Sequence, residues 1–543
     1  MVGSGNGACG FLSNYLKYAP TDAAVLVLEE GKNYFYTSDI THQNSWTKSY
    51  SEGNIFKLHN ARTVDGTPIL SGRACTMGGG GSINYTMIHE SSKWLAKNIG
   101  YTEAYWDALK KELNAEFHRP DPAAIATSVT DHILTAGEKL HFQAPDPTQR
   151  IHNISSYKDQ DEKQLYQFPT QFNSFGQRTN SGVSLVDWED PRITLETRRV
   201  VESLKLQEDG RCTMVVAKNL EDAGWFRRAS SSQEYFLSPN GGQVVLCAGA
   251  ASPRILQPYR EVLQNDAIGK FVNDHICLPL GIYVVNDDLK VSPKDIYGPV
   301  FGTALWKAPE SGDGEDTVVC IDFFTGSLQK QLYMTSHLFL AFLPNCLKSP
   351  MLRHPLLFTI VKNVVRTLIS GVDLLISLAT KEDPVFITAI IKYNAAKTGQ
   401  YEDGDHIALG WFEESQDKEV AKSVITDVAL PLMEQLGKEP NPVIQFIFRM
   451  LTKIPFDQSQ VDEYVDNYSK NSLLSEQHMA GGCLFGKVID TGEDDQSKTG
   501  RVFGSTNVHV ADLSSVPLPR VSPQMTAYLV GYHVSHQLYS SRK

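Results

Sequence analysis

The sequence lacks several residue patterns, and each of these absences excludes a class of protein. Its eight cysteines among 543 residues include no C-x-x-C pair, which argues against a zinc knuckle and a dense disulfide framework. Lysine and arginine number 50 against 62 acidic residues, so no basic surplus is available to neutralise nucleic-acid phosphates. No signal peptide is visible. We expect a soluble protein that binds no nucleic acid, with its compartment unassigned.

Long uninterrupted apolar runs are also missing. The most apolar region spans residues 351–393, and Lys362, Arg366 and Asp373 interrupt it too often for a transmembrane span of about 20 residues. We expect a buried helical hairpin here. The alternative is a surface that contacts a membrane or an apolar substrate. The sequence does not indicate an oligomeric state.

Glycine, in contrast, is concentrated at the start of the chain. Gly5, Gly7 and Gly10 have G-x-G-x-x-G spacing, and a helical segment, an apolar strand over 25–28 and Glu29 follow. This order is typical of a dinucleotide cradle, in which the acidic residue accepts a hydrogen bond from a ribose hydroxyl. Only four residues precede Gly5, and a first strand usually needs about five. We therefore expect that either the first strand or the start of the chain is clipped.

Three later segments point to the same large ligand. Four consecutive glycines begin at Gly78, and we expect them to lie against a flat ligand rather than to form a flexible linker. A buried strand over 243–248 leads into a small-residue turn at Ala250. The strand 508–511 ends at Asp512, where an α/β sheet places its ligands. At this length, two or more domains are expected.

In order along the chain, these segments resemble the glucose-methanol-choline (GMC) family of FAD-dependent oxidoreductases. The similar segments are residues 5–10 with 25–31, 72–73 with 78–84, 248–253, 268–275, and the tail from 478 to 523. Residues 481–484 and 486–488 are particularly similar to the plant hydroxynitrile lyase branch. Residues 276–470 contain no family motif, as expected of a variable substrate domain.

The resemblance implies an α/β fold in which a Rossmann-type FAD-binding domain carries an inserted α+β substrate domain, built from an antiparallel sheet and helices. The FAD-binding domain would be discontinuous, comprising 1–95, 190–275 and 478–543. The substrate domain and inserted helices would comprise 96–189 and 276–477. No histidine lies in the 78–84 segment, where some relatives tether FAD, so non-covalent FAD is expected.

The resemblance also implies roles for individual residues. His478 would be the catalytic base, since a neutral imidazole near its unperturbed pKa suits that task at neutral pH. Ser522 occupies the second catalytic position, where the family has His or Asn before a proline. The residues implied in cofactor binding are Gly5, Gly7, Gly10, Glu29, Gly78, Gly79, Asn84, Ala250, Asp512 and Pro523. No metal site is expected.

Serine at position 522 departs from the family pattern and leaves three interpretations open. An altered oxidase could use Ser522 through a water, a shifted alignment could make Gln524 supply the amide, or the protein could have left alcohol oxidation. The first hypothesis for function is therefore an FAD-dependent alcohol oxidase or dehydrogenase that transfers hydride from a CH-OH donor to flavin. The alternatives are a redox-neutral hydroxynitrile lyase-like enzyme with structural FAD, and a flavin-binding protein with weakened activity.

Overall fold

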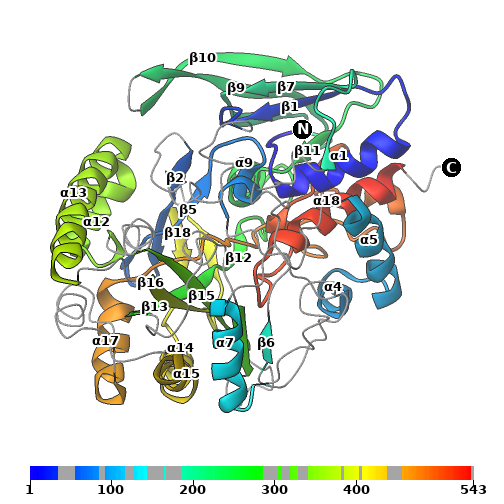
Figure 1. Cartoon of the computed structure of the whole chain (residues 1–543). Coiled ribbons are helices and arrows are strands. Elements are labelled where there is room, and N and C mark those ends of the chain that lie inside the picture. The colour runs from blue at the N-terminus through cyan, green and yellow to red at the C-terminus, as the bar shows by residue number, and fades with distance from the viewer. Residues whose placement is uncertain are drawn as a thin grey trace.

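A computed structural model of the chain defines two domains (Figure 1). The residues it describes are 1–34, 55–84, 92–116, 128–142, 164–166, 185–223, 226–284, 302–307, 318–327, 340–380, 385–402, 406–436, 455 and 457–539.

A parallel sheet forms the centre of the first domain. Its strands are, in spatial order, β7 (Ile193–Thr197), β1 (Val25–Glu29), residues 1–3, β11 (Val244–Leu246) and β19 (Val508–Val510). Their aliphatic side chains suit a sheet that is covered on both faces. The first and last segments of the chain thus lie near each other in one sheet, and the order is that of a doubly wound dinucleotide-binding fold.

The first strand is short, comprising residues 1–3, but it is paired on both sides. The backbone N–H of Val2 donates to the carbonyl of Val245 at 2.9 Å, and the N–H of Cys247 donates to the carbonyl of Val2 at 2.8 Å. On the other side, the N–H of Gly3 donates to the carbonyl of Leu28 at 2.8 Å. Three residues suffice because a strand on each side completes the ladder.

Helices and a three-stranded antiparallel sheet complete this domain. They are α1 (Asn6–Tyr18), α4 (Ser92–Ile99), α5 (Glu103–Glu116), α9 (Ser252–Leu256), α18 (Gln524–Tyr539), and β8 (Arg199–Leu206), β9 (Cys212–Ala223) and β10 (Phe226–Phe236). Trp106 and Leu109 of α5 are buried in the same core as α1 and α18. This helix therefore packs with the nucleotide domain, whereas the prediction placed residues 96–189 with the substrate domain.

The second domain is built around an antiparallel sheet, as predicted. Its strand order is β13 (His275–Val284), β16 (Val385–Asn394), β15 (Val318–Ser327), β14 (Gly302–Lys307) and β6 (Gln164–Tyr166). The helices that pack near it are α7 (Ser128–Lys139), α14 (Ser415–Val424), α15 (Leu430–Leu436) and α17 (Val461–Asn471). The side chains of Lys392 and Asp322 form an ion pair between β16 and β15, and both are fully buried.

Two smaller sheets connect the domains. One has the order β12 (Lys270–Val272), β17 (Gly399–Tyr401), β18 (His406–Leu409), β3 (Asn60–Thr63) and β4 (Pro68–Ile69), and the other pairs β2 (Phe56–Leu58) with β5 (Gly72–Ala74). Ala61 and Ile69 belong to the core of the second domain. The chain therefore crosses between domains within residues 1–95, which the prediction assigned wholly to FAD binding.

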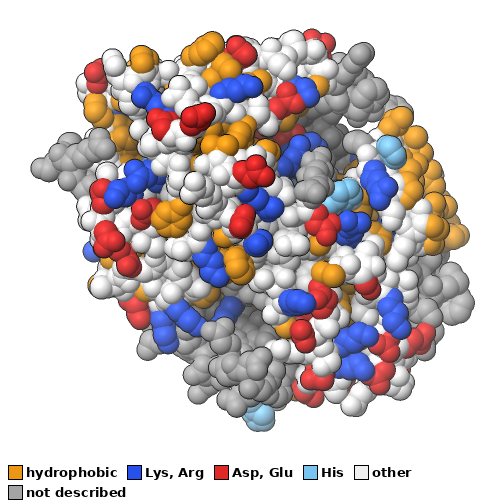
Figure 2. All heavy atoms as spheres, turned by 180° about the vertical axis from the view of Figure 1, so that it is seen from behind, with side chains coloured by type: hydrophobic (Ala, Val, Ile, Leu, Met, Phe, Trp, Pro, Cys, Tyr) orange, Lys and Arg blue, Asp and Glu red, His pale blue; other side chains and the backbone are white. Residues whose placement is uncertain are grey.

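Helices α12 (Asn345–Arg353) and α13 (Pro355–Thr380) lie on the surface, at one edge of the molecule. Phe358 is buried against the second domain. The exposed aliphatic side chains of α13 are Leu356, Ile360, Val364, Leu368, Leu374, Leu375 and Leu378, and apolar side chains gather along the corresponding edge in Figure 2. The prediction of a buried hairpin is therefore wrong for this face. Within the described residues, no helix combines the length and apolarity needed to cross a bilayer.

Candidate active site

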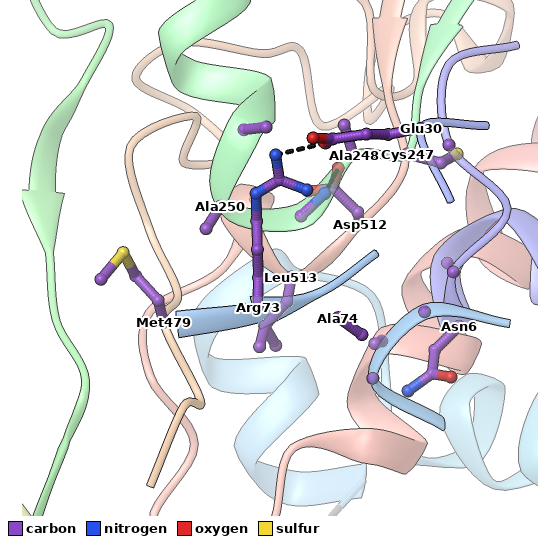
Figure 3. A pocket seen from close by; sticks show the side chains of 18 of the residues that line it. Asn6, Glu30, Arg73, Ala74, Cys247, Ala248, Ala250, Met479, Asp512 and Leu513 are labelled. Atoms are coloured by element: carbon purple, nitrogen blue, oxygen red, sulfur yellow. Dashed lines mark hydrogen bonds and ion pairs between the residues drawn. The ribbon is translucent and has the colours of Figure 1, made fainter. Parts of the chain in front are cut away.

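A cavity lies at the carboxyl ends of the parallel strands, and its lining comes from segments far apart in sequence (Figure 3). The lining residues fall in 2–7, 28–30, 57–59, 72–74, 79–84, 199–201, 247–255, 476–479, 512–513 and 522–527. The glycine turn, the second glycine cluster, the turn after β11 and the tail are thus brought together, as their order along the chain predicted.

The structure places the predicted site residues in the lining of this cavity with two exceptions, Gly10 and Gly78. A Cβ on Gly10 would lie 2.1 Å from the carbonyl oxygen of Tyr528, so this glycine allows α1 to approach α18. Gly78 has a φ of +82° and donates its N–H to the carbonyl of Ser4 at 3.1 Å. Both glycines therefore support the backbone around the cavity without lining it.

The turn at the end of the first strand uses Gly3 and Gly5. The predicted G-x-G-x-x-G motif, which started at Gly5, is therefore placed two residues too far along the chain. Gly3 has a φ of +90°, and a Cβ there would lie 2.5 Å from the carbonyl oxygen of Cys247. Gly5 is the N-cap of α1. The sequence signal for this register is Val2 directly before Gly3.

The N-terminus of α1 is suited to a phosphate. Gly5, Asn6 and Gly7 line the cavity, no side chain caps the helix, and its first turn contains no acidic residue. The backbone N–H groups of the first helical turn and the helix dipole favour an anion there. Gly80 and Gly249 also line the cavity, and a Cβ on either would meet no atom within 4 Å. These residues therefore fit the pyrophosphate and leave room for the body of the FAD that the resemblance implies.

Glu29 is held at the cavity by groups of the glycine turn. Its Oε2 accepts hydrogen bonds from the N–H of Ser4 at 2.9 Å and the hydroxyl of Ser4 at 2.7 Å, and its Oε1 accepts one from the N–H of Gly31 at 2.6 Å. Burial raises the pKa of Glu29, and these hydrogen bonds oppose that rise. Oε1 keeps a lone pair, so it could accept a ribose hydroxyl.

The residue next to Glu29, Glu30, forms an ion pair that the sequence did not predict. The Arg73 guanidinium contacts the Glu30 carboxylate at the cavity wall (Figure 3), and Lys57 lies 3.3 Å from the same carboxylate. Although burial raises the pKa of Glu30, Arg73 and Lys57 lower it to about 2. Glu30 therefore remains ionised. The Gly72-Arg73 motif was visible in the sequence, but the partner of Arg73 was not.

Asp512 ties the end of β19 to the turn after β11. Its Oδ2 accepts hydrogen bonds from the N–H of Gly249 at 2.8 Å and the hydroxyl of Ser252 at 2.6 Å. Its Oδ1 accepts from the N–H and hydroxyl of Ser514 at 2.8 and 2.6 Å. Four donors occupy the carboxylate, so Asp512 contributes to the cavity by fixing the Gly249 turn.

His478 lines the cavity and contacts a second histidine. Its Nδ1 lies 2.9 Å from Nδ1 of His275, and Nε2 of His275 lies 2.9 Å from the carbonyl oxygen of Pro519. The backbone N–H groups of His275 and His478 both donate to Oδ1 of Asp274, at 2.9 and 2.8 Å. Asp274 therefore fixes the backbone of both histidines.

The environment keeps both imidazoles neutral. Burial, then the neighbouring His275 and Lys392, hold the pKa of His478 well below its ordinary value. Burial and Lys392 lower the pKa of His275 to about 3. The expectation of a near-unperturbed pKa is therefore wrong for His478. Its neutral imidazole can still accept a proton, but the lowered pKa makes it a weaker base.

Ser522 offers a hydroxyl to the same cavity. It is buried and lines the cavity beside Pro523 and Gln524, and within the described part of the chain its hydroxyl makes no hydrogen bond. The amide of Gln524 accepts from Nδ2 of Asn84 at 2.5 Å and donates to the hydroxyl of Tyr528 at 2.8 Å. The Gln524 amide is therefore engaged at both ends, which favours Ser522 as the group that meets a substrate.

The parallel sheet, its glycine turn and the cavity between two domains define the class, a dinucleotide-binding α/β protein with a separate substrate domain. Residues 397–531 match the family model of the GMC oxidoreductases. No curated protein is detected as a sequence relative of the chain.

Solved structures share the fold over nearly the whole chain. An arginine-to-alanine variant of the formate oxidase of Aspergillus oryzae RIB40, studied for FAD modification, has a TM-score of 0.65 at 14% identity and covers 99% of this chain and 97% of its own. Pyridoxine 4-oxidase from Mesorbium loti has a TM-score of 0.64 at 14% identity, covering 99% and 98%. An FAD-dependent oxidoreductase from Chaetomium thermophilum has a TM-score of 0.59 at 12% identity, covering 100% and 99%. The chain therefore shares the fold of these enzymes, and its residues 397–531 are similar to the GMC oxidoreductase family.

Proposed function

We propose that the protein is an FAD-dependent oxidoreductase that oxidises a small-molecule alcohol, with His478 as the base. The observation that carries the proposal is a half-buried His478 that lines the same cavity as the glycine cradle and whose lowered pKa keeps it neutral. When bound, FAD supplies the hydride acceptor that this oxidation needs. Residues 3–7, Glu29 and the Gly249 turn would hold it.

The chain's own residues would perform the proton chemistry. Neutral His478 accepts the hydroxyl proton of the alcohol, which leaves the oxygen negatively charged and its carbon a better hydride donor. The hydroxyl of Ser522 donates a hydrogen bond to that oxygen. Because both side chains lie in a largely buried lining, the charged oxygen is shielded from bulk water, where its hydrogen bonds would be weaker.

Anaerobic mixing of the purified flavoprotein with a panel of alcohols tests this function, because reduced flavin loses its visible absorbance. We expect bleaching with at least one alcohol, and about a 10²-fold or larger loss of rate in His478→Ala, the typical contribution of a general base. His354→Ala, at an exposed position after α12, is the matched control and should bleach at the wild-type rate. An unchanged rate in His478→Ala would exclude His478 as the base.

The lyase and the non-catalytic flavoprotein stay as alternative predictions. The residues that suggested a lyase, Gly481, Gly482 and Cys483, are not part of the cavity lining. Gly481 and Gly482 have φ values of +82° and +96° and lie close to Phe271 and Pro253. These positions support packing as the reason for the motif. Cyanide release from mandelonitrile without bleaching would support the lyase, and bound flavin with neither reaction would support the third alternative.

A further inference from the structure

The contacts of His275 determine which of its nitrogens carries a proton. Nε2 faces the carbonyl oxygen of Pro519 at 2.9 Å. A carbonyl only accepts hydrogen bonds, so Nε2 must be the protonated nitrogen of this ring. A neutral imidazole carries one N–H, so Nδ1 of His275 is bare and can only accept.

The same reasoning extends to His478. Its Nδ1 lies 2.9 Å from the bare Nδ1 of His275, so Nδ1 of His478 must carry the proton and donate. Nε2 of His478 is then the bare nitrogen. Within the described part of the chain Nε2 has no hydrogen-bond partner, and the side chain lines the cavity.

We propose that His275 is a positioning residue that sets the tautomer of His478, so that the basic Nε2 of His478 is presented to the substrate. Pro519, His275 and His478 form a chain of hydrogen bonds with one direction, from the His478 ring through His275 to the carbonyl. This inference rests on the proposed role of His478 as base. His275 does not touch the substrate.

The surroundings of His275 prevent it from reversing the direction of these hydrogen bonds. An imidazolium at position 275 would donate from both nitrogens and turn His478 into an acceptor at Nδ1. The charged or titratable groups near this pair are the buried Lys392–Asp322 ion pair, Glu476 and Asp274. Lys392 and burial both disfavour a proton on His275, and Asp274 accepts from the backbone N–H groups rather than from either ring.

Two substitutions that differ in one acceptor test the proposal. His275→Leu removes the acceptor, and we expect flavin reduction by the alcohol to slow about 10- to 100-fold, part of the contribution of a general base, with KM little changed. His275→Asn places an amide oxygen near the former Nδ1 and should recover much of that loss. Both variants lose the contact with Pro519, so the acceptor is the difference between them. Equal rates in His275→Leu and wild type, or no recovery in His275→Asn, would overturn the proposal.

A spectroscopic measurement separates this proposal from the proposed function. In protein labelled with 15N-histidine, the signals of His478, assigned by their loss in His478→Ala, should show a protonated Nδ1 and a bare Nε2, and His275→Leu should abolish that preference. A protonated Nε2 in the wild type would refute the inference. If the tautomer is as expected but no alcohol bleaches the flavin, the proposed function fails while the role of His275 stands.

Discussion

The buried ion pair between Lys392 and Asp322 gives the sharpest prediction about stability. Both side chains have no exposed surface, and Asp322 accepts a further hydrogen bond from the Cys320 thiol at 3.4 Å. Replacing Lys392 by Met would leave the Asp322 carboxylate buried without its cation. Removing one partner of a buried pair typically costs about 3–5 kcal/mol. We expect Lys392→Met to lower the apparent free energy of unfolding by about this amount.

The double variant Lys392→Met/Asp322→Leu is the critical comparison. It removes both charges, and replacing a buried pair by apolar residues of similar volume is often neutral or stabilising. We therefore expect the double variant to be more stable than Lys392→Met alone, measured by urea unfolding with flavin absorbance and circular dichroism followed together. If the double variant is as unstable as the single one, packing rather than an unpaired charge is the cause, and the reasoning is refuted.

Two further predictions concern stability. Burial lowers the pKa values of His275 and His533 from 6.5 to about 3. Between these pH values, both histidines are protonated in the unfolded chain but not in the folded one. Their stabilisation is complete above about pH 6.5 and falls toward about pH 3, by about 1.4 kcal/mol per histidine per pH unit. Asp274 and Asp417, whose pKa values burial raises to about 7 and about 6, oppose this fall, so the test compares His533→Phe with wild type: an equal fall in the free energy of unfolding between about pH 6.5 and about pH 5 would contradict the prediction. A Cβ on Gly7 would lie 2.2 Å from the carbonyl oxygen of Ala511, so Gly7→Ala should cost about 1–3 kcal/mol. Gly371→Ala, whose Cβ would meet no atom within 4 Å, is the control and should melt at or above the wild-type temperature.

The sequence predicted the two-domain architecture because its signals are local. Apolar strands, glycine turns and the acidic residue at the end of β1 each follow from a few neighbouring residues. The register of the first glycine turn was missed because Val2 forms a strand only through partners at Leu28 and Leu246, and these lie far along the chain.

The same limit applies to the candidate site. His478 was found by its motif, but its partner His275 belongs to a different segment, and only the packing of the two domains brings the rings together. The exposed face of α13 was missed for another reason. Apolar residues at helical spacing indicate that a helix has an apolar face, but they do not indicate which part of the protein covers it.

The strand order has a consequence for when this protein can fold during synthesis. The parallel sheet places residues 1–3 beside β11, and β11 beside β19, while α1 packs against α18. At about 5–20 residues per second, the ribosome reaches β19 roughly 25–100 s after β1. During that interval, the nascent nucleotide domain lacks an edge strand and the helix that covers α1. The cradle can be completed only when nearly all of the sequence is outside the ribosome, so cofactor capture is a late event that follows translation of the substrate domain.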